Sequence, residues 1–139
     1  MTTTEVKEIL SKARSAGLQY FKARDRYRSF EHRLTGGKAI RYNGTGAEFK
    51  HNGNAVENAY CELSDREAEM NRCREGLSAP YRAAGKLIYL VEDDKRRQVL
   101  NMRYLYCKSW EQIAMELNVN IRQIYRLHGY ALEEISKKA

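Results

Sequence analysis

The sequence predicts an all-α protein in which a long antiparallel helical hairpin of the coiled-coil type precedes a helix-turn-helix. Three observations predict this fold. Apolar residues repeat with a helical period along two long segments, a Gly- and Asn-rich stretch separates them, and the C-terminal third contains short capped helices around a turn. We expect residues 1–79 to form the hairpin, with its loop at 35–54, and residues 80–139 to form the helix-turn-helix domain.

The first expected helix spans residues 4–34. Its apolar positions are separated alternately by three and four residues, which is the heptad repeat of a helix that packs along one face. These positions are Val6, Ile9, Ala13, Ala16, Tyr20, Ala23, Tyr27, Phe30 and Leu34. Basic residues between them, such as Lys12 and Arg14, are expected on the solvent-facing side. Gly17 is a weak position, costing about 1 kcal/mol relative to alanine.

Residues 35–54 contain more than half of the nine glycines and show no helical period. The turn dipeptides Asn43-Gly44 and Asn52-Gly53 indicate a connection. The stretch lacks the Gly-x-x-x-x-Gly-Lys-Ser/Thr pattern, so we do not interpret it as a phosphate-binding loop.

A second apolar repeat begins at Val56, where Asn54 is the expected N-cap. The pattern breaks near Pro80, because an interior proline loses a hydrogen bond and clashes with the preceding turn. Residues 55–91 therefore form either one kinked helix or two abutting helices, with Ser78 as a candidate cap for the second.

Charge is unevenly distributed along the chain, whose net charge is +7. Residues 1–54 carry 11 basic and 5 acidic side chains, residues 55–79 carry 3 and 6, and residues 80–139 carry 11 and 7. A basic helix followed by an acidic one favours antiparallel pairing. The basic excess would attract nucleic-acid phosphates, but charge alone fits a merely soluble surface equally well.

Several function classes lack their sequence signals. No apolar run is long enough to span a membrane, and the N-terminus lacks the apolar core of a signal peptide, so we expect a cytoplasmic protein. Cys61, Cys73 and Cys107 fit neither a zinc site nor a disulfide framework and are expected as buried or half-buried thiols. No catalytic constellation is present, so we expect no enzyme, no cofactor and no metal site.

Three short helical segments are expected in the C-terminal third. The first begins at Asp93 or Asp94 and runs to Leu105. The second follows a capping box formed by Ser109 and Gln112. The third follows a turn and is the longest of them.

The turn before the third segment contains Asn118, and asparagine adopts the left-handed conformation more readily than other non-glycine residues. Asn120 is the expected cap of the third segment. Apolar residues that face inward on both sides of the turn are Ile113, Ala114, Leu117, Val119, Ile124 and Leu127. This spacing is typical of a helix-turn-helix, which presents the start of its second helix to the DNA major groove. A generic helical hairpin is the alternative.

The same residues carry a family resemblance. Val99-Leu-Asn-Met-Arg-Tyr-Leu105, Ser109-Trp-Glu-Gln-Ile-Ala114 and Asn120-Ile-Arg-Gln-Ile-Tyr-Arg-Leu-His128 resemble region four of bacterial sigma factors. More narrowly, residues 85–136 resemble small phage and prophage proteins of Gram-positive bacteria, including the ArpU- and RinA-type late-gene regulators. The resemblance implies a sigma-region-four-like fold, duplex DNA binding and transcriptional regulation of phage late genes, at the nucleoid of a bacterial host cell.

The resemblance assigns DNA reading to the outward face of the helix after the turn. The residues assigned are Asn120, Ile121, Arg122, Gln123, Tyr125 and Arg126, with Lys108 and Ser109 as phosphate contacts on the preceding helix. Arg122 and Arg126 are one turn apart and suit guanine edges or phosphates, and Gln123 suits adenine. Ile121 stands where sigma factors usually have arginine, which puts promoter recognition in doubt and fits contact with a thymine methyl group.

Other residues of this region keep two interpretations. Trp110 is either a phosphate contact or a core residue. Arg96, Arg97 and Arg103 either contact the DNA backbone or are simply solvated. His128 is expected to be structural, because no acidic partner lies at helical spacing from it.

Double-stranded DNA is thus the expected partner, with bacterial RNA polymerase as a second candidate. The hairpin is expected either to form a homodimer or to dock on polymerase. Two alternative functions remain: a small terminase-like DNA-packaging subunit, which would assemble into rings, and an RNA polymerase-binding adaptor that does not bind DNA.

Overall fold

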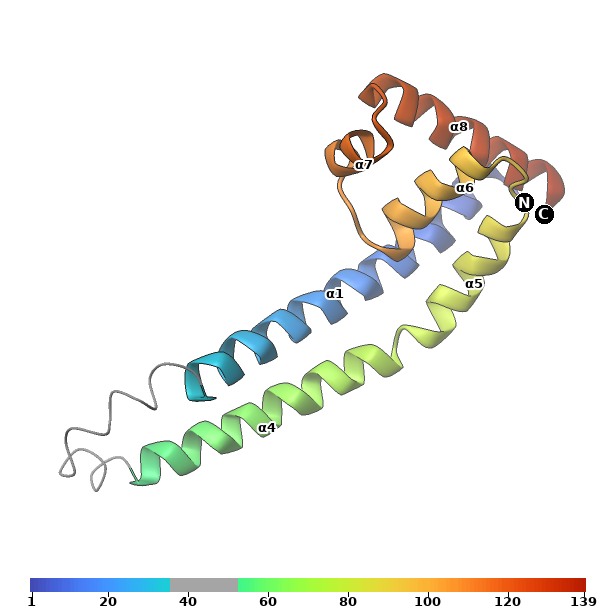
Figure 1. Ribbon diagram of the computed structural model, residues 1–139. Coiled ribbons are helices and arrows are strands. Elements are labelled where there is room, and N and C mark those ends of the chain that lie inside the picture. Colours follow the sequence, from blue (N-terminus) through green and yellow to red (C-terminus); the bar gives the residue numbers. More distant parts are fainter. Residues whose placement is uncertain (36–52) are drawn as a thin grey trace. The chain divides into compact units, whose positions relative to one another are not determined.

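The computed structural model describes residues 1–35 and 53–139, and every element in these ranges is a helix (Figure 1). The elements are α1 (Thr3–Thr35), α4 (Gly53–Glu75), α5 (Ser78–Tyr89), α6 (Asp94–Leu100), the π-helix η2 (Asn101–Leu105), α7 (Trp110–Leu117) and α8 (Ile121–Lys138). The described part of the chain is therefore all-α, as the sequence predicts. Most of the connection expected at 35–54 lies outside the described residues.

Two compact units divide the chain, and α1 contributes to both. Unit 1 consists of residues 1–18 and 76–139, and unit 2 consists of residues 19–75. The boundary expected after residue 79 lies close to the observed one after Glu75. The first half of α1, which the sequence analysis assigned to the hairpin, groups instead with the C-terminal helices.

The main core of unit 1 gathers side chains from α1, α5, α6, η2 and α8. Its buried residues are Val6, Leu10, Ala13, Ala84, Leu87, Ile88, Val91, Leu100, Tyr104, Ala131, Leu132 and Ile135. The heptad pattern missed Leu10, which is fully buried, whereas Ile9 is only partly buried. In this half of α1 positions 6, 10, 13 and 17 are buried while Ile9 and Ala16 are half-buried, so the buried face is rotated from the expected seam toward positions 10 and 17.

Gly17 lies at a close approach within unit 1. A β-carbon at this position would lie 2.7 Å from Cys107 Sγ and closer still to the Tyr81 hydroxyl oxygen. That hydroxyl donates a hydrogen bond to the Leu105 carbonyl oxygen at 2.7 Å, so it is held in place. The weak position expected from the sequence is therefore a packing requirement, since no larger residue fits without displacing its neighbours.

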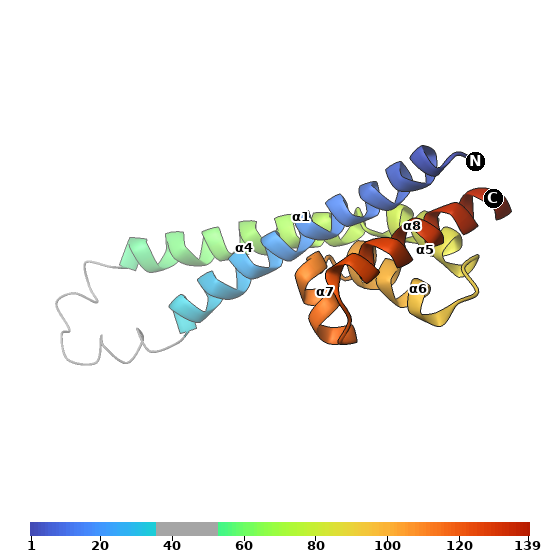
Figure 2. The same cartoon turned by 90° about the horizontal axis from the view of Figure 1, so that it is seen from above.

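A second, smaller core joins α6, α7 and α8, which lie next to one another in both views (Figures 1 and 2). Val99, Ile113 and Ile124 are buried at its centre. Met102, Trp110, Ala114, Leu117, Val119 and Leu127 pack against them. This packing confirms the inward-facing set that the sequence analysis expected on both sides of the turn.

The helix expected from residue 93 to 105 changes type along its length. α6 ends at Leu100, and the next five residues form the π-helix η2. Asp93 is the N-cap residue of α6, but its side chain accepts no capping hydrogen bond. A π-helix is rare and often lies near a functional site, and this one turns Arg103 and Tyr104 toward the groove described below.

Residues 55–91 form two separate helices, α4 and α5, rather than one kinked helix. The prediction that Ser78 caps α5 is wrong, since Leu77 is the N-cap residue and no side chain caps this helix. Pro80 lies in the first turn of α5, where its missing N–H has no helical partner to lose.

Unit 2 pairs the second half of α1 with α4 in antiparallel order. Arg26 forms an ion pair with Glu69 (3.5 Å), the Arg66 guanidinium lies 4.9 Å from the Phe30 ring centroid, and that of Arg74 lies 5.8 Å from the Tyr20 ring centroid. Among the described residues of this unit, Ala23 and Met70 are the buried apolar ones. The expected seam is thus mostly half-buried.

The structure differs from the sequence prediction at the start of α4 and at Cys61. α4 begins at Gly53, one residue before the expected cap Asn54, whose side chain lies outside the described residues. Cys61 is exposed rather than buried, whereas Cys73 and Cys107 are half-buried and all three thiols are free.

Candidate nucleic-acid interface

α7 begins with the capping box that the sequence predicts. The Gln112 backbone N–H donates to Ser109 Oγ at 3.2 Å, and the Ser109 backbone N–H donates to Gln112 Oε1 at 3.0 Å. Two backbone donors at the helix start are thereby satisfied. The first residue of α7, Trp110, is fixed in position over the smaller core.

A turn of three residues links α7 to α8. Asn118 adopts the left-handed conformation (φ 54°, ψ 46°), which confirms the expectation for this position. Asn120 then caps α8, because its side-chain oxygen accepts a hydrogen bond from the Arg122 backbone N–H at 3.1 Å. Val119 packs between them against the smaller core, so both helices are held at a defined angle.

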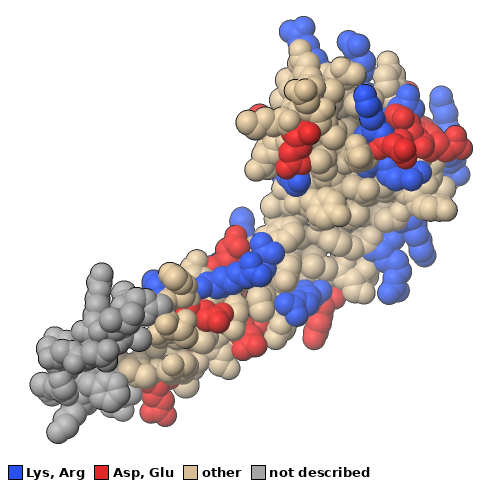
Figure 3. Space-filling view, in the orientation of Figure 1, with Lys and Arg blue, Asp and Glu red and all other residues tan. Residues whose placement is uncertain are grey.

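The first two turns of α8 expose polar and basic side chains. Arg122, Gln123, Tyr125 and Arg126 are exposed, and Ile121 is half-buried. On the opposite side of the same turns, Ile124 and Leu127 pack inward. Neither arginine forms an ion pair with any residue in the described ranges. Basic side chains project from this part of α8 in Figure 3.

Lys108 and Ser109, the two phosphate contacts expected at the start of α7, already have partners within the chain. Lys108 Nζ lies 2.6 and 2.8 Å from the two carboxylate oxygens of Glu116. The Ser109 hydroxyl oxygen accepts the capping bond of α7. The structure therefore brings Asn120, Gln123, Arg122 and Arg126 together at one end of α8, while the Lys108 charge is paired.

Arg96, Arg97 and Arg103 were expected either to contact the DNA backbone or to be solvated. Each of them contacts another residue of the chain. Arg96 lies 3.5 Å from Glu134, Arg97 Nε donates to the Val91 carbonyl oxygen at 3.0 Å, and the Arg103 guanidinium lies 4.3 Å from the Trp110 ring centroid. None of them is simply solvated.

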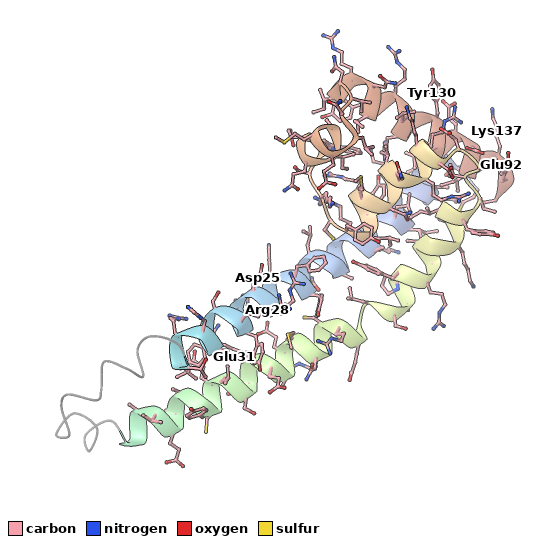
Figure 4. The ribbon with its side chains drawn as sticks, viewed as in Figure 1. Asp25, Arg28, Glu31, Glu92, Tyr130 and Lys137 are labelled. Carbon is pink, nitrogen blue, oxygen red and sulfur yellow. The ribbon has the colours of Figure 1, made fainter. Side chains whose placement is uncertain are left out.

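The second half of α8 carries mixed charge, unlike the first half. Lys138 Nζ lies 3.0 Å from a Glu92 carboxylate oxygen and 3.1 Å from one of Glu134. In Figure 4, Glu92 lies in the connection before α6, and Tyr130 and Lys137 lie on α8. Acidic and basic side chains lie side by side over this region in Figure 3. The end of α8 thus mixes acidic and basic side chains, and Lys137 there forms no ion pair among the described residues, whereas the charged side chains at its start are all basic.

A groove of about 590 Å³ opens in unit 1 between the first half of α1 and the elements η2, α7 and α8. Its lining residues are Lys7, Ser11, Arg14, Ser15, Leu18, Arg103, Tyr104, Trp110, Tyr125 and His128. Three are basic and none is acidic. The sequence analysis missed this site, because Lys7 and Arg14 are about a hundred residues from the aromatic wall and Arg14 was expected in solvent.

His128 is half-buried at the groove, next to Tyr104. The Tyr104 hydroxyl oxygen and His128 Nε2 lie 2.6 Å apart. Burial, and to a lesser extent the positive charges of Lys7 and Arg103, lower the pKa of His128 to about 4. Burial also raises the pKa of Tyr104, so a neutral imidazole meets a protonated phenol at neutral pH. The structural role expected for His128 fits this contact.

The described residues contain no group of three or more His, Cys, Asp and Glu side chains that could hold a metal ion. Within the same residues, no helix combines the length and the apolar character needed to cross a membrane. No family model matches the sequence, and searches of curated proteins and of solved structures return no significant match.

Proposed function

We propose that the protein binds double-stranded DNA sequence-specifically and regulates transcription, with α7 and α8 acting as a sigma-region-four-like helix-turn-helix. The observation that carries this proposal is the start of α8, where Arg122 and Arg126 are exposed and form no ion pair within the described residues. The role in phage or prophage late genes follows from the family resemblance alone.

The geometry of this helix start suits the major groove. Arg122 and Arg126 are spaced by one turn and can each contact a guanine edge or a phosphate, and a good bidentate pair discriminates between bases by about 1–3 kcal/mol. Gln123, between them, suits an adenine. Asn118 and Asn120 set the turn and the cap, so α8 starts abruptly at Ile121.

A homodimer through the helices of unit 2 is part of the proposal. In α4, Val56 and Tyr60 are 43% and 54% exposed although the apolar repeat begins there. Burying such side chains against a second copy would add to stability, and dimers bind two DNA half-sites. The mass of the assembly that the full chain forms in solution distinguishes a dimer from the rings expected of a packaging subunit.

Fluorescence anisotropy of labelled duplexes, measured with the full chain at two salt concentrations, tests the DNA-binding proposal. We expect one duplex to be preferred and affinity to fall as salt rises, because counterions are released from phosphates on binding. The double variant Arg122→Ala/Arg126→Ala should weaken binding at least about tenfold.

The matched control is Arg82→Ala/Lys86→Ala, which removes two exposed cations at the same spacing from α5. We expect this variant to bind within about threefold of the unaltered protein, since a change in net charge alone acts weakly at physiological salt. Equal loss in both double variants, or no salt-sensitive binding, would contradict DNA reading by α8. The second result would favour docking of α8 on a protein such as RNA polymerase.

A further inference from the structure

The groove in unit 1 has the size and the walls of a small-molecule site. Its volume of about 590 Å³ falls within the range of about 300–1,000 Å³ that is usual for such sites. One wall is the first half of α1, and the other is formed by Trp110, Tyr125 and His128. All of its lining residues belong to unit 1.

Positive charge gathers in this groove. Lys7, Arg14 and Arg103 line it, and no lining residue is acidic. In the described part of the chain, Lys7 and Arg14 form no ion pair. Arg14 Nε is buried without a hydrogen-bond partner, and an unsatisfied buried donor costs about 1–3 kcal/mol.

The same cations act on one another across the groove. Burial and then the positive charge of Arg14 lower the pKa of Arg103, while Tyr104, Tyr125 and Glu111 act in the opposite direction. After burial, Lys7 and Arg103 are the causes that lower the pKa of His128. A bound anion would be stabilised by all three cations at once.

The aromatic wall suits a planar ring. Trp110 meets Tyr125 edge-on at a centroid distance of 5.3 Å and meets His128 edge-on at 4.9 Å. Stacking of a base on an aromatic side chain contributes about 1–3 kcal/mol for each base, and the Arg103 guanidinium lies 4.3 Å from the Trp110 ring centroid on this wall. We propose that this groove binds a phosphate-bearing planar ligand of mononucleotide size, with its phosphate at Arg14 and Lys7 and its ring at Trp110 and Tyr125. This proposal does not depend on the DNA-binding role of α8.

Trp110 is the single tryptophan of the chain, so its emission reports on this groove. The full chain is titrated with adenosine monophosphate, followed by tryptophan fluorescence and in parallel by calorimetry. We expect saturable binding, and Arg14→Gln should weaken it about tenfold because it removes a charge-assisted hydrogen bond. Lys12→Gln, on the exposed face of the same helix, is the control and should leave binding unchanged.

Three further ligands show which part of the nucleotide the groove recognises. Uncharged adenosine should bind at least about tenfold more weakly than the monophosphate, and inorganic phosphate should compete with it. Competition by duplex DNA would identify the DNA backbone as the natural source of phosphate, whereas simultaneous binding would identify a free nucleotide. The proposal is overturned if neither method detects binding at millimolar monophosphate, or if adenosine binds as well as the monophosphate and Arg14→Gln has no effect.

Discussion

The two halves of α1 have the same kind of sequence and different surroundings. In unit 1, Val6, Leu10 and Ala13 are fully buried, whereas in unit 2 the larger residues Tyr27, Phe30 and Leu34 are only half-buried. Four other elements contribute to the core around the first half, whereas among the described residues of unit 2 the second half packs against α4. Helical periodicity therefore predicts which face is apolar, but the number of neighbouring elements determines how deeply that face is buried.

The contacts between the helices also differ in kind. Unit 1 is held by apolar cores, whereas α1 and α4 in unit 2 meet through an exposed ion pair and through α4 arginines that lie over α1 aromatic rings. Charge complementarity between a basic and an acidic helix predicted the antiparallel order. It did not predict that the acidic helix would supply the cations for these ring contacts.

The largest expected effect is on the buried half of α1. Leu10→Ala should lower the free energy of unfolding of unit 1 by about 3 kcal/mol, because it leaves a cavity in the main core. Leu34→Ala, on the same helix but half-buried, should cost about 1 kcal/mol or less. Urea denaturation of both variants measures the difference, and equal costs would contradict the contrast between the halves.

Gly17→Ala should destabilise the protein by about 1–3 kcal/mol, although alanine is the better helix former. The added methyl group meets Cys107 Sγ and the Tyr81 hydroxyl. Gly85→Ala is the matched change, because its β-carbon meets no atom within 4 Å, and it should stabilise by up to about 1 kcal/mol. The opposite signs are visible in thermal unfolding, and stabilisation by both changes would disprove the close approach at Gly17.

His128 should make the stability of unit 1 depend on pH. Its pKa is about 4 in the folded protein and near 6.5 in the unfolded chain, so between these values the unfolded chain binds a proton that the folded protein does not. The stability that depends on a neutral His128 imidazole is fully present above pH 6.5, and it is lost as the pH falls toward 4. After discounting for partial exposure, the loss is on the order of 2 kcal/mol.

The measurement is the free energy of unfolding at pH 7 and pH 4.5. His128→Gln should flatten the change between these two pH values, while His32→Gln, at an exposed position of α1, should not. An unchanged pH dependence in His128→Gln would show that the imidazole is not held neutral by its surroundings.

The smallest expected effect is on the ion pair of unit 2. Arg26→Ala should change the free energy of unfolding by about 0.5 kcal/mol or less, because both partners of the Arg26–Glu69 pair are largely exposed. A cost above about 1.5 kcal/mol in denaturation experiments would mean that this pair contributes more than an exposed salt bridge does.

Local sequence signals predicted the C-terminal elements well. The capping box at Ser109, the left-handed Asn118 and the cap at Asn120 depend on residues within a few positions of one another, and the structure confirms all three. The π-helix η2 was not predicted. The spacing of apolar residues does not distinguish a five-residue π-helix from a continuation of the α-helix before it.

Long-range features could not be predicted in the same way. The burial of Leu10, the close approach at Gly17 and the basic groove with Arg14 all depend on elements far away in the chain. No local pattern records which helix will lie against α1. The paired state of Lys108 depends on Glu116, which lies eight residues later in α7.

The most direct test of the account compares basic residues of the two units in duplex binding by the full chain. Arg122→Ala/Arg126→Ala alters the start of α8, and Lys22→Ala/Arg28→Ala removes two exposed cations from the second half of α1. The account predicts that the α8 variant loses affinity for the preferred duplex by at least about tenfold, while the α1 variant retains it within about threefold. Retained binding in the α8 variant together with loss in the α1 variant would contradict DNA reading by α8 and assign it to the basic face of α1.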